Sequence, residues 1–180
     1  NKRTYVAVGN RNDKKIRVAS TFSDDTIEID IDNLSPQNVS GWSAYPLGVA
    51  WAIIDKGVES INLVGVDLYI DSDVPVGAGL SSSAAIESAV VVALNDIWNL
   101  NLDLQTMAKI GQLAENKAVG APTGIMDQSA SLLGKRDAGV FLDCRTLEAE
   151  IVPLGFEAAS LELLVIDTKV KHSHVSGGYA

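Results

Sequence analysis

The order of its secondary-structure signals constrains this chain most. Strand-like segments come first, helical segments fill the middle, and strand-like segments return at the end. This order lacks the regular strand–helix alternation of a doubly wound sheet, and no internal repeat is present, so we expect one α+β domain. The expected strands cover residues 4–8, 16–20, 26–31, 60–70, 139–143, 149–153 and 161–167, and the expected helices cover 39–56, 81–99, 104–119 and 125–133.

Side-chain spacing indicates the buried faces of two of these segments. Residues 26–31 alternate isoleucine with polar, mostly acidic residues, which is typical of a strand with one buried and one solvated face. We expect those acids to be surface charge rather than metal ligands. In residues 39–56 an apolar stripe follows a helical period, and Pro46 predicts that the helix begins or bends near that position.

The composition excludes several function classes. The chain has 180 residues, of which 47% are hydrophobic, so it can bury a core and is not a disordered segment. Because 23 acidic residues outnumber 14 basic ones, we expect no nucleic-acid partner. The lack of any run of about 18 apolar residues predicts no membrane span. Cys144 is the single cysteine, which favours a reducing compartment, and we expect a cytoplasmic protein.

The segment from Pro75 to Ala85, Pro-Val-Gly-Ala-Gly-Leu-Ser-Ser-Ser-Ala-Ala, carries the clearest functional signal. Its two glycines let the backbone approach a ligand closely, and its three serines stand where a helix is expected to begin. The first N–H groups of a helix are unpaired and carry partial positive charge, so a phosphate can bind there. The segment matches neither the Walker A pattern nor Gly-x-Gly-x-x-Gly, and an ordinary glycine-rich turn with a serine cap is the alternative.

Two acids downstream complete a candidate site for phosphoryl transfer. Glu115 lies near the end of an expected helix, and Asp127 lies one turn into the next helix, for which Thr123 is the expected cap. Each acid alone is as readily explained as a solvated or dipole-stabilising residue. Together with the glycine and serine loop they supply N–H donors, carboxylates and hydroxyls, which phosphoryl transfer requires. His172 and His174 form only a weak metal signal, because no third ligand lies near them in the sequence.

Several segments, in order along the chain, resemble the GHMP kinases, the superfamily that includes galactokinase, homoserine kinase, mevalonate kinase and phosphomevalonate kinase. Residues 75–85 resemble its phosphate loop, and Ser81 is similar to the galactokinase version of that loop. The resemblance implies a fold like the second domain of ribosomal protein S5. It also implies that residues 1–180 form the N-terminal, ATP-binding domain of a GHMP kinase, incomplete at its N-terminus. Three further segments are similar to galactokinase motifs: 124–128, 143–148, and 171–173 followed by Tyr179.

The resemblance implies an enzyme that phosphorylates galactose to galactose 1-phosphate, the first committed step of galactose catabolism, with ATP as donor and Mg²⁺ as the metal. Asp127 would accept or orient the proton of the anomeric hydroxyl, and Gly124 would contact the sugar through its backbone. Ser83 and Glu115 would coordinate the magnesium ion. Trp42 matches a tryptophan near the adenine pocket of relatives, although core packing explains it equally well. The residues expected to wrap the phosphates are Gly77, Ala78, Gly79, Leu80, Ser81, Ser82 and Ser83.

The sequence also departs from that family. Its N-terminal sugar-binding motif, Gly-Glu-His-Thr-Asp-Tyr, and its glycine-rich C-terminal motif are absent, and the chain starts at Asn1 rather than Met. We therefore expect a piece of a longer protein that is inactive alone and that self-associates through uncovered apolar surface. Two alternatives remain open; the missing sugar-binding motif would discriminate the first, and the intact serine and alanine loop favours an enzyme over the second. One is a kinase for N-acetylgalactosamine, arabinose or another small alcohol, and the other is a sensor of galactose and ATP without turnover.

Overall fold

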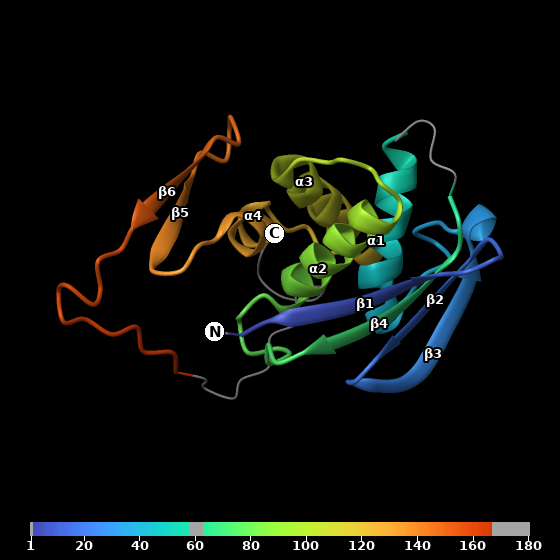
Figure 1. Cartoon of the computed structure of the whole chain (residues 1–180), viewed down its shortest axis with the longest axis horizontal. Coiled ribbons are helices and arrows are strands. Elements are labelled where there is room, and N and C mark those ends of the chain that lie inside the picture. Colours follow the sequence, from blue (N-terminus) through green and yellow to red (C-terminus); the bar gives the residue numbers. More distant parts are fainter. Residues whose placement is uncertain (1, 58–62, 167–180) are drawn as a thin grey trace.

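A four-stranded sheet forms one layer of the computed structural model, which describes residues 2–57 and 63–166 (Figure 1). β4 is antiparallel to β1 and parallel to β2, and β2 is antiparallel to β3. This mixed sheet, covered by helices, confirms the α+β prediction and excludes a doubly wound parallel sheet. The strands are β1 (Thr4–Asn10), β2 (Lys15–Ser20), β3 (Ser23–Asp30) and β4 (Val66–Ser72), in the spatial order β1-β4-β2-β3.

Helix α1 (Ala44–Asp55) connects the β2–β3 hairpin to β4, which lets β2 and β4 run parallel. Two short 3₁₀ turns, Ile31–Asn33 and Gly41–Ser43, precede it. The sequence predicts a helix from residue 39, but α1 begins at residue 44. Pro46 lies in the first turn, where a missing N–H leaves no intrahelical bond unmade. The prediction that the helix begins near Pro46 is confirmed.

Three further helices follow β4. The helix predicted over 104–119 is α-helical only as far as Ala114, because a π-helical turn continues it from Glu115 to Val119. α1 and α2 cover one face of the sheet, α3 packs against both of these helices, and α4 packs against α2 and α3 (Figure 1). The bounds of these helices are α2 (Ser82–Ile97), α3 (Leu104–Ala114) and α4 (Met126–Leu133).

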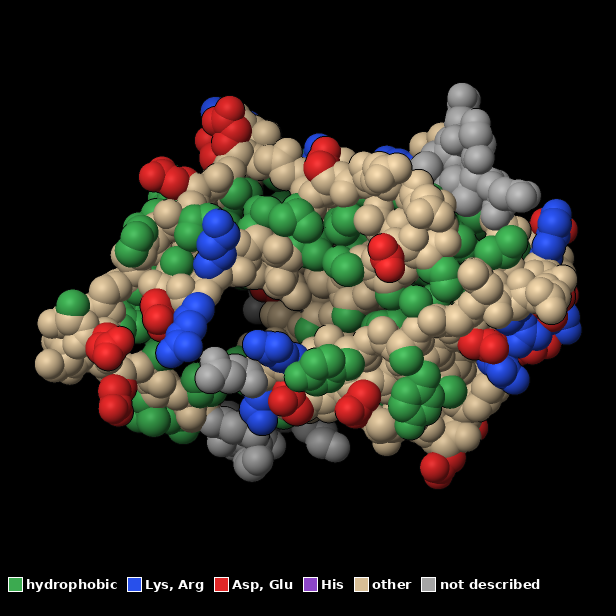
Figure 2. All heavy atoms as spheres, in the orientation of Figure 1, with side chains coloured by type: hydrophobic (Ala, Val, Ile, Leu, Met, Phe, Trp, Pro, Cys, Tyr) green, Lys and Arg blue, Asp and Glu red, His purple; other side chains and the backbone are tan. Residues whose placement is uncertain are grey.

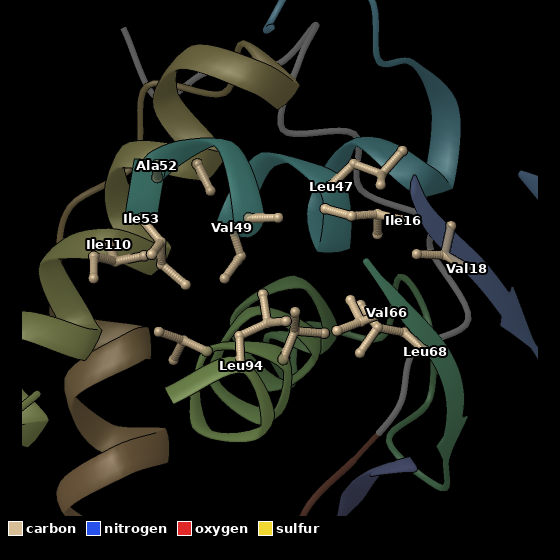
Figure 3. Packing of buried hydrophobic residues seen from close by; sticks show 14 of the residues in the cluster. Ile16, Val18, Leu47, Val49, Ala52, Ile53, Val66, Leu68, Leu94 and Ile110 are labelled. Atoms are coloured by element: carbon tan, nitrogen blue, oxygen red, sulfur yellow. The ribbon is translucent and has the colours of Figure 1, made fainter. Parts of the chain in front are cut away.

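The core lies where the helices meet each other and the sheet. Figure 3 shows Val49 and Ile53 of α1 pointing toward Leu94 of α2 and Ile110 of α3. The sheet contributes its inward-facing aliphatic side chains to the same cluster. This packing fixes the position of the helices relative to the strands, and these helices carry the candidate site. These inward-facing residues include Ile16, Val18, Val66, Leu68 and Ile70.

The opposite face of the sheet is not covered by any described helix. Tyr69 there is 51% exposed, and both oxygens of Asp67 accept hydrogen bonds from Arg17, at 2.8 and 2.9 Å. Glu28 of β3 pairs with Lys15 at 2.7 Å, which confirms that the acids of this strand are surface charge. Figure 2 shows acidic and basic side chains close together at the right-hand edge of the molecule.

The C-terminal part of the described chain differs from the prediction in one place. β5 (Ala138–Leu142) and β6 (Ala149–Pro153) pair antiparallel, as expected. The strand predicted over 161–167 is wrong, since residues 161–166 have no regular structure and Leu163 and Leu164 are 77% and 78% exposed. A strand needs a neighbouring strand to bond its N–H and C=O groups, and no described strand pairs with this segment.

Several predictions fall partly or wholly outside the described residues. The strand predicted over 60–70 begins only at Val66, and its residues 60–62 lie outside. Within the parts of the chain that the structure covers, no helix has the length and apolar character needed to cross a membrane. The other predicted features outside the described residues are Asp167, His172, His174, and the segment 171–173 with Tyr179.

Candidate active site

The loop between β4 and α2 takes a tight path into the helix. Gly77 and Gly79 both have φ of +74°, and Ser81 lies in the left-handed region with φ 53° and ψ 50°. Glycine adopts this conformation without steric cost, whereas serine requires support from the surrounding loop. Ser81 is the N-cap residue of α2, but its side chain bonds none of the helix N–H groups. Those N–H groups therefore remain available to an anionic ligand.

This loop and the start of α4 line one cavity of about 480 Å³. Gly79, Leu80 and Ser81 line it together with Asp127, which is half-buried in the first turn of α4. The sequence predicts that the loop and Asp127 belong to one site, and the structure brings them to one cavity. The other lining residues are Lys2, Val74, Ala85, Ala130, Ser131 and Val165.

Glu115 opens the π turn that follows α3, and it is only 3% exposed. Such turns change the direction of a side chain relative to the preceding helix and are frequent at functional sites. Its Oε2 accepts hydrogen bonds from Thr123 Oγ1 and from Gln128 Nε2, both at 2.8 Å. The prediction that Thr123 caps α4 is wrong, because its hydroxyl is bonded to Glu115 and Ile125 is the N-cap residue.

Glu87 of α2 is completely buried, and sequence reasoning missed it. Its Oε2 accepts a hydrogen bond from Gln128 Nε2 at 2.9 Å, so one amide bridges two carboxylates. Burial raises the pKa of Glu87 well above its usual value, and the nearby negative charge of Glu115 acts in the same direction. A signal was present in the sequence, because Glu87 lies on the helical stripe of Val91 and Leu94, where an acid is out of place.

The other predicted residues take different positions. Ser82 and Ser83 form the first turn of α2 and are half-buried. Gly124 is exposed before α4, and an added Cβ there would meet no atom within 4 Å. Trp42 packs edge-on against Phe22, with ring centroids 5.5 Å apart, and is not among the described residues that line the cavity. Core packing accounts for these contacts of Trp42, and its contact with adenine stays a prediction.

The residues present fit a magnesium ion that arrives with a nucleotide. No group of three or more His, Cys, Asp or Glu side chains in the described ranges could hold a metal ion by itself. Mg²⁺ that accompanies phosphates needs only one or two protein oxygens, because phosphate oxygens and water complete its coordination. Of the two carboxyl oxygens of Glu115, Oε2 accepts both of the hydrogen bonds found among the described residues. Oε1 is therefore available as a metal ligand.

Residues 44–135, which contain this loop and both acids, match the family described as GHMP kinases N terminal domain. A galactokinase from Streptomyces coelicolor is 44% identical over 174 residues, which cover 96% of this chain and 44% of that protein. A galactokinase from Lactobacillus helveticus is 38% identical over 180 residues, or 97% of this chain and 45% of that protein.

A solved structure is also similar. The crystal structure of Lactococcus lactis galactokinase complexed with galactose matches with a TM-score of 0.76 and 35% identity, over 84% of this chain and 39% of that one. This chain therefore spans less than half the length of each of these relatives.

Proposed function

The chain belongs to the GHMP kinase family, and from this premise we propose that it forms the nucleotide-binding part of an enzyme that transfers a phosphoryl group from ATP to galactose. The relatives described above are galactokinases. One observation carries the proposal: the glycine and serine loop and Asp127 line the same cavity. A phosphoryl donor held by this loop faces a carboxylate that can take up the proton of the attacking hydroxyl.

In this proposal the start of α2 binds the phosphates of ATP. The backbone of residues 77–83 supplies N–H donors, and the hydroxyls of Ser81, Ser82 and Ser83 add further donors. The positive end of the helix dipole favours the negative charge of the phosphates. Because the chain has a net charge of −9, nucleotide binding depends on these local donors rather than on the overall field. Trp42 would contact the adenine ring.

We assign Mg²⁺ to Ser83 and Glu115. When bound, the ion neutralises negative charge on the phosphate oxygens during transfer. Glu115 keeps Oε2 in its hydrogen bonds with Thr123 and Gln128, and Oε1 would be the oxygen that holds the ion. The carboxylate is thus held by two donors while it binds the metal, which limits its rotation.

Asp127 receives or orients the proton of the anomeric hydroxyl of galactose, and the product is galactose 1-phosphate. Its carboxyl group lies in the first turn of α4, near the N-terminal end of that helix. The exposed backbone at Gly124 contacts the sugar. Electrostatic stabilisation and positioning, rather than covalent chemistry, supply the rate enhancement.

The test uses the whole protein that contains this chain, assayed for ADP release with galactose, N-acetylgalactosamine, arabinose and no sugar. We expect galactose to give the highest kcat/KM. Asp127→Asn should lower kcat by about 100- to 10,000-fold, since it removes the proton acceptor but keeps the shape of the side chain. Asp137→Asn, a change at an exposed acid just after α4, serves as the matched control and should leave kcat unchanged.

Other outcomes would redirect the assignment. Undiminished phosphorylation by Asp127→Asn removes Asp127 from the chemistry. Preference for another acceptor in the panel identifies a different small-molecule kinase of the family. Tight binding of galactose and ATP without ADP release identifies a sensor.

We further propose a cytoplasmic location and self-association of the isolated chain. The single cysteine is free and exposed, which suits a reducing compartment. The apolar side chains of residues 161–166 are exposed and offer surface for a second molecule.

A further inference from the structure

Glu87 is fully buried, and the phosphoryl transfer proposed above does not use it. Its Oε1 has no hydrogen-bond partner among the described residues. A buried carboxyl group without its full set of partners costs free energy. Replacing a buried charged or polar group by an apolar one of similar size is often neutral or stabilising. Stability alone therefore does not account for an acid at this position.

Glu87 reaches the candidate site through Gln128, which directly follows Asp127 in α4. Gln128 is 1% exposed, and its Nε2 donates to Glu87 Oε2 at 2.9 Å and to Glu115 Oε2 at 2.8 Å. An amide nitrogen carries two hydrogens, so both are used. The orientation of the Gln128 side chain is fixed from two sides, and loss of the Glu87 acceptor removes one of these restraints.

Gly111 of α3 provides the space for this contact. A Cβ added at Gly111 would lie 3.0 Å from Cγ of Gln128 and 3.5 Å from Cβ of Glu87. An added side chain at Gly111 would therefore crowd the Gln128 side chain that carries the amide. Glu115 follows Gly111 by four residues and begins the π turn after α3, so the contact with Gln128 lies about one turn before the proposed metal ligand.

We propose that Glu87 is a positioning residue that holds the Gln128 amide, so that Glu115 and the adjacent Asp127 keep the orientation required for phosphoryl transfer. The inference rests on the proposed function for its kinetic readout. The three linked side chains come from α2, from the π turn after α3, and from α4. Their contact therefore fixes the phosphate-binding turn, the metal ligand and the acid relative to one another.

The experiment is a double-mutant cycle in the whole protein with Glu87→Leu, Gln128→Met and the double variant. Each single change should lower kcat by about 10- to 100-fold, as loss of a residue that orients a metal ligand commonly does. The double variant should be no slower than Gln128→Met alone, because Glu87 acts only through Gln128. Glu87→Gln keeps an oxygen acceptor for Gln128 and should restore most of the lost kcat. Val91→Ala, which truncates a buried side chain on the same helix, should lower the melting temperature but not kcat.

Three results would overturn the inference. They are an unchanged kcat in Glu87→Leu, losses of kcat that multiply in the double variant, or a loss of kcat in Val91→Ala as large as that in Glu87→Leu for the same loss of melting temperature. A second readout separates this inference from the proposed function. If the wild-type protein phosphorylates no sugar, the proposed function fails, and Mn²⁺ affinity in the presence of a non-hydrolysable ATP analogue decides the role of Glu87. An affinity about tenfold weaker in Glu87→Leu supports the role, and an unchanged affinity refutes it.

Discussion

Two groups of acidic residues find their hydrogen-bond donors in opposite ways. One group lies between α2, α3 and α4, and the other lies on the open face of the sheet. On the sheet, Asp67 accepts hydrogen bonds from the guanidinium groups of Arg11 and Arg17 and keeps contact with water. Between the helices, Glu87 and Glu115 are buried, and both accept from the neutral amide of Gln128.

The difference separates acidic residues that form exposed ion pairs from acidic residues that are buried next to a candidate site. Exposed ion pairs form at little desolvation cost and contribute little, so they can be exchanged without large effect. Burying two carboxyl groups that share one amide carries an unfavourable desolvation free energy. Apolar side chains would fill the same space without that penalty. Because both acids bond Gln128, which directly follows Asp127, a role in the proposed site explains their presence better than stability does.

The largest expected contrast is between Glu115→Gln and Asp67→Asn. Glu115→Gln removes the negative charge proposed to bind Mg²⁺, so kcat/KM for ATP should fall by about 10- to 100-fold and the required Mg²⁺ concentration should rise. Asp67→Asn should change activity less than twofold, on the order of experimental scatter, and stability by less than about 1 kcal/mol. Initial rates measured across a Mg²⁺ series check both. Equal losses of kcat/KM in the two variants would contradict the proposed difference between buried and exposed acids.

A smaller contrast concerns two glycines. Gly111→Ala places a Cβ 3.0 Å from Gln128 and should cost about 1–3 kcal/mol of stability, with a loss of activity because the amide moves. Gly9→Ala, on β1 opposite Asp67, meets no atom within 4 Å and should stabilise by about 0.4–1 kcal/mol, since alanine restricts the unfolded chain. Chemical denaturation of both variants tests this. A neutral Gly111→Ala would show that the cluster tolerates an added methyl group.

The smallest expected contrast is in the pH dependence of stability. The hydrogen bond from Arg11 lowers the pKa of Asp13 from 3.8 to about 2, and the hydrogen bond from Lys15 lowers the pKa of Glu28. A lowered folded pKa contributes stability above the unfolded pKa, and this is lost as pH falls from about 4 to about 2. Asp13→Asn should therefore flatten the acid limb of a plot of melting temperature against pH.

The pH dependence of stability that arises from Glu87 has the opposite sign to that from Asp13. The pKa of Glu87 in the folded protein is raised above 4.5. Its contribution to the free energy of unfolding is therefore fully present below pH 4.5 and is lost as pH rises through the folded pKa. The titratable groups around it are Glu115, Asp127 and Tyr45, and burial with the charges of Glu115 and Glu87 raises the pKa of Tyr45. Glu87→Gln should remove part of the decline in melting temperature above pH 4.5. A decline identical to that of the wild type would contradict the assignment.

Much of the fold could be predicted from local pattern. Residue patterns predicted β1 to β3 and all four helices, with alternation in residues 26–31 and a helical stripe in residues 39–56, and Pro46 predicted the start of α1. The strand expected over 161–167 failed for a physical reason. Its apolar side chains fit a strand, but a strand exists only where another strand bonds its backbone, and pattern alone does not supply that partner.

The candidate site divides in the same way. The glycine and serine loop and Asp127 could be chosen because, taken together, their residue types suit phosphate binding and proton transfer. Thr123 could not be assigned correctly, because its hydroxyl bonds Glu115 across a turn rather than the nearest helix N–H. Glu87 and Gln128 were missed because their roles depend on a contact between residues 41 positions apart.

By itself the sequence determined the order of strands and helices, the loop proposed to bind phosphate and the acid proposed to face it, because these follow from backbone chemistry and hydrophobic period over short distances. Only the tertiary structure decided that the loop and Asp127 share one cavity and that Gln128 links Glu87 to Glu115. Such contacts depend on how three helices pack, and helix packing depends on the shapes of many side chains at once.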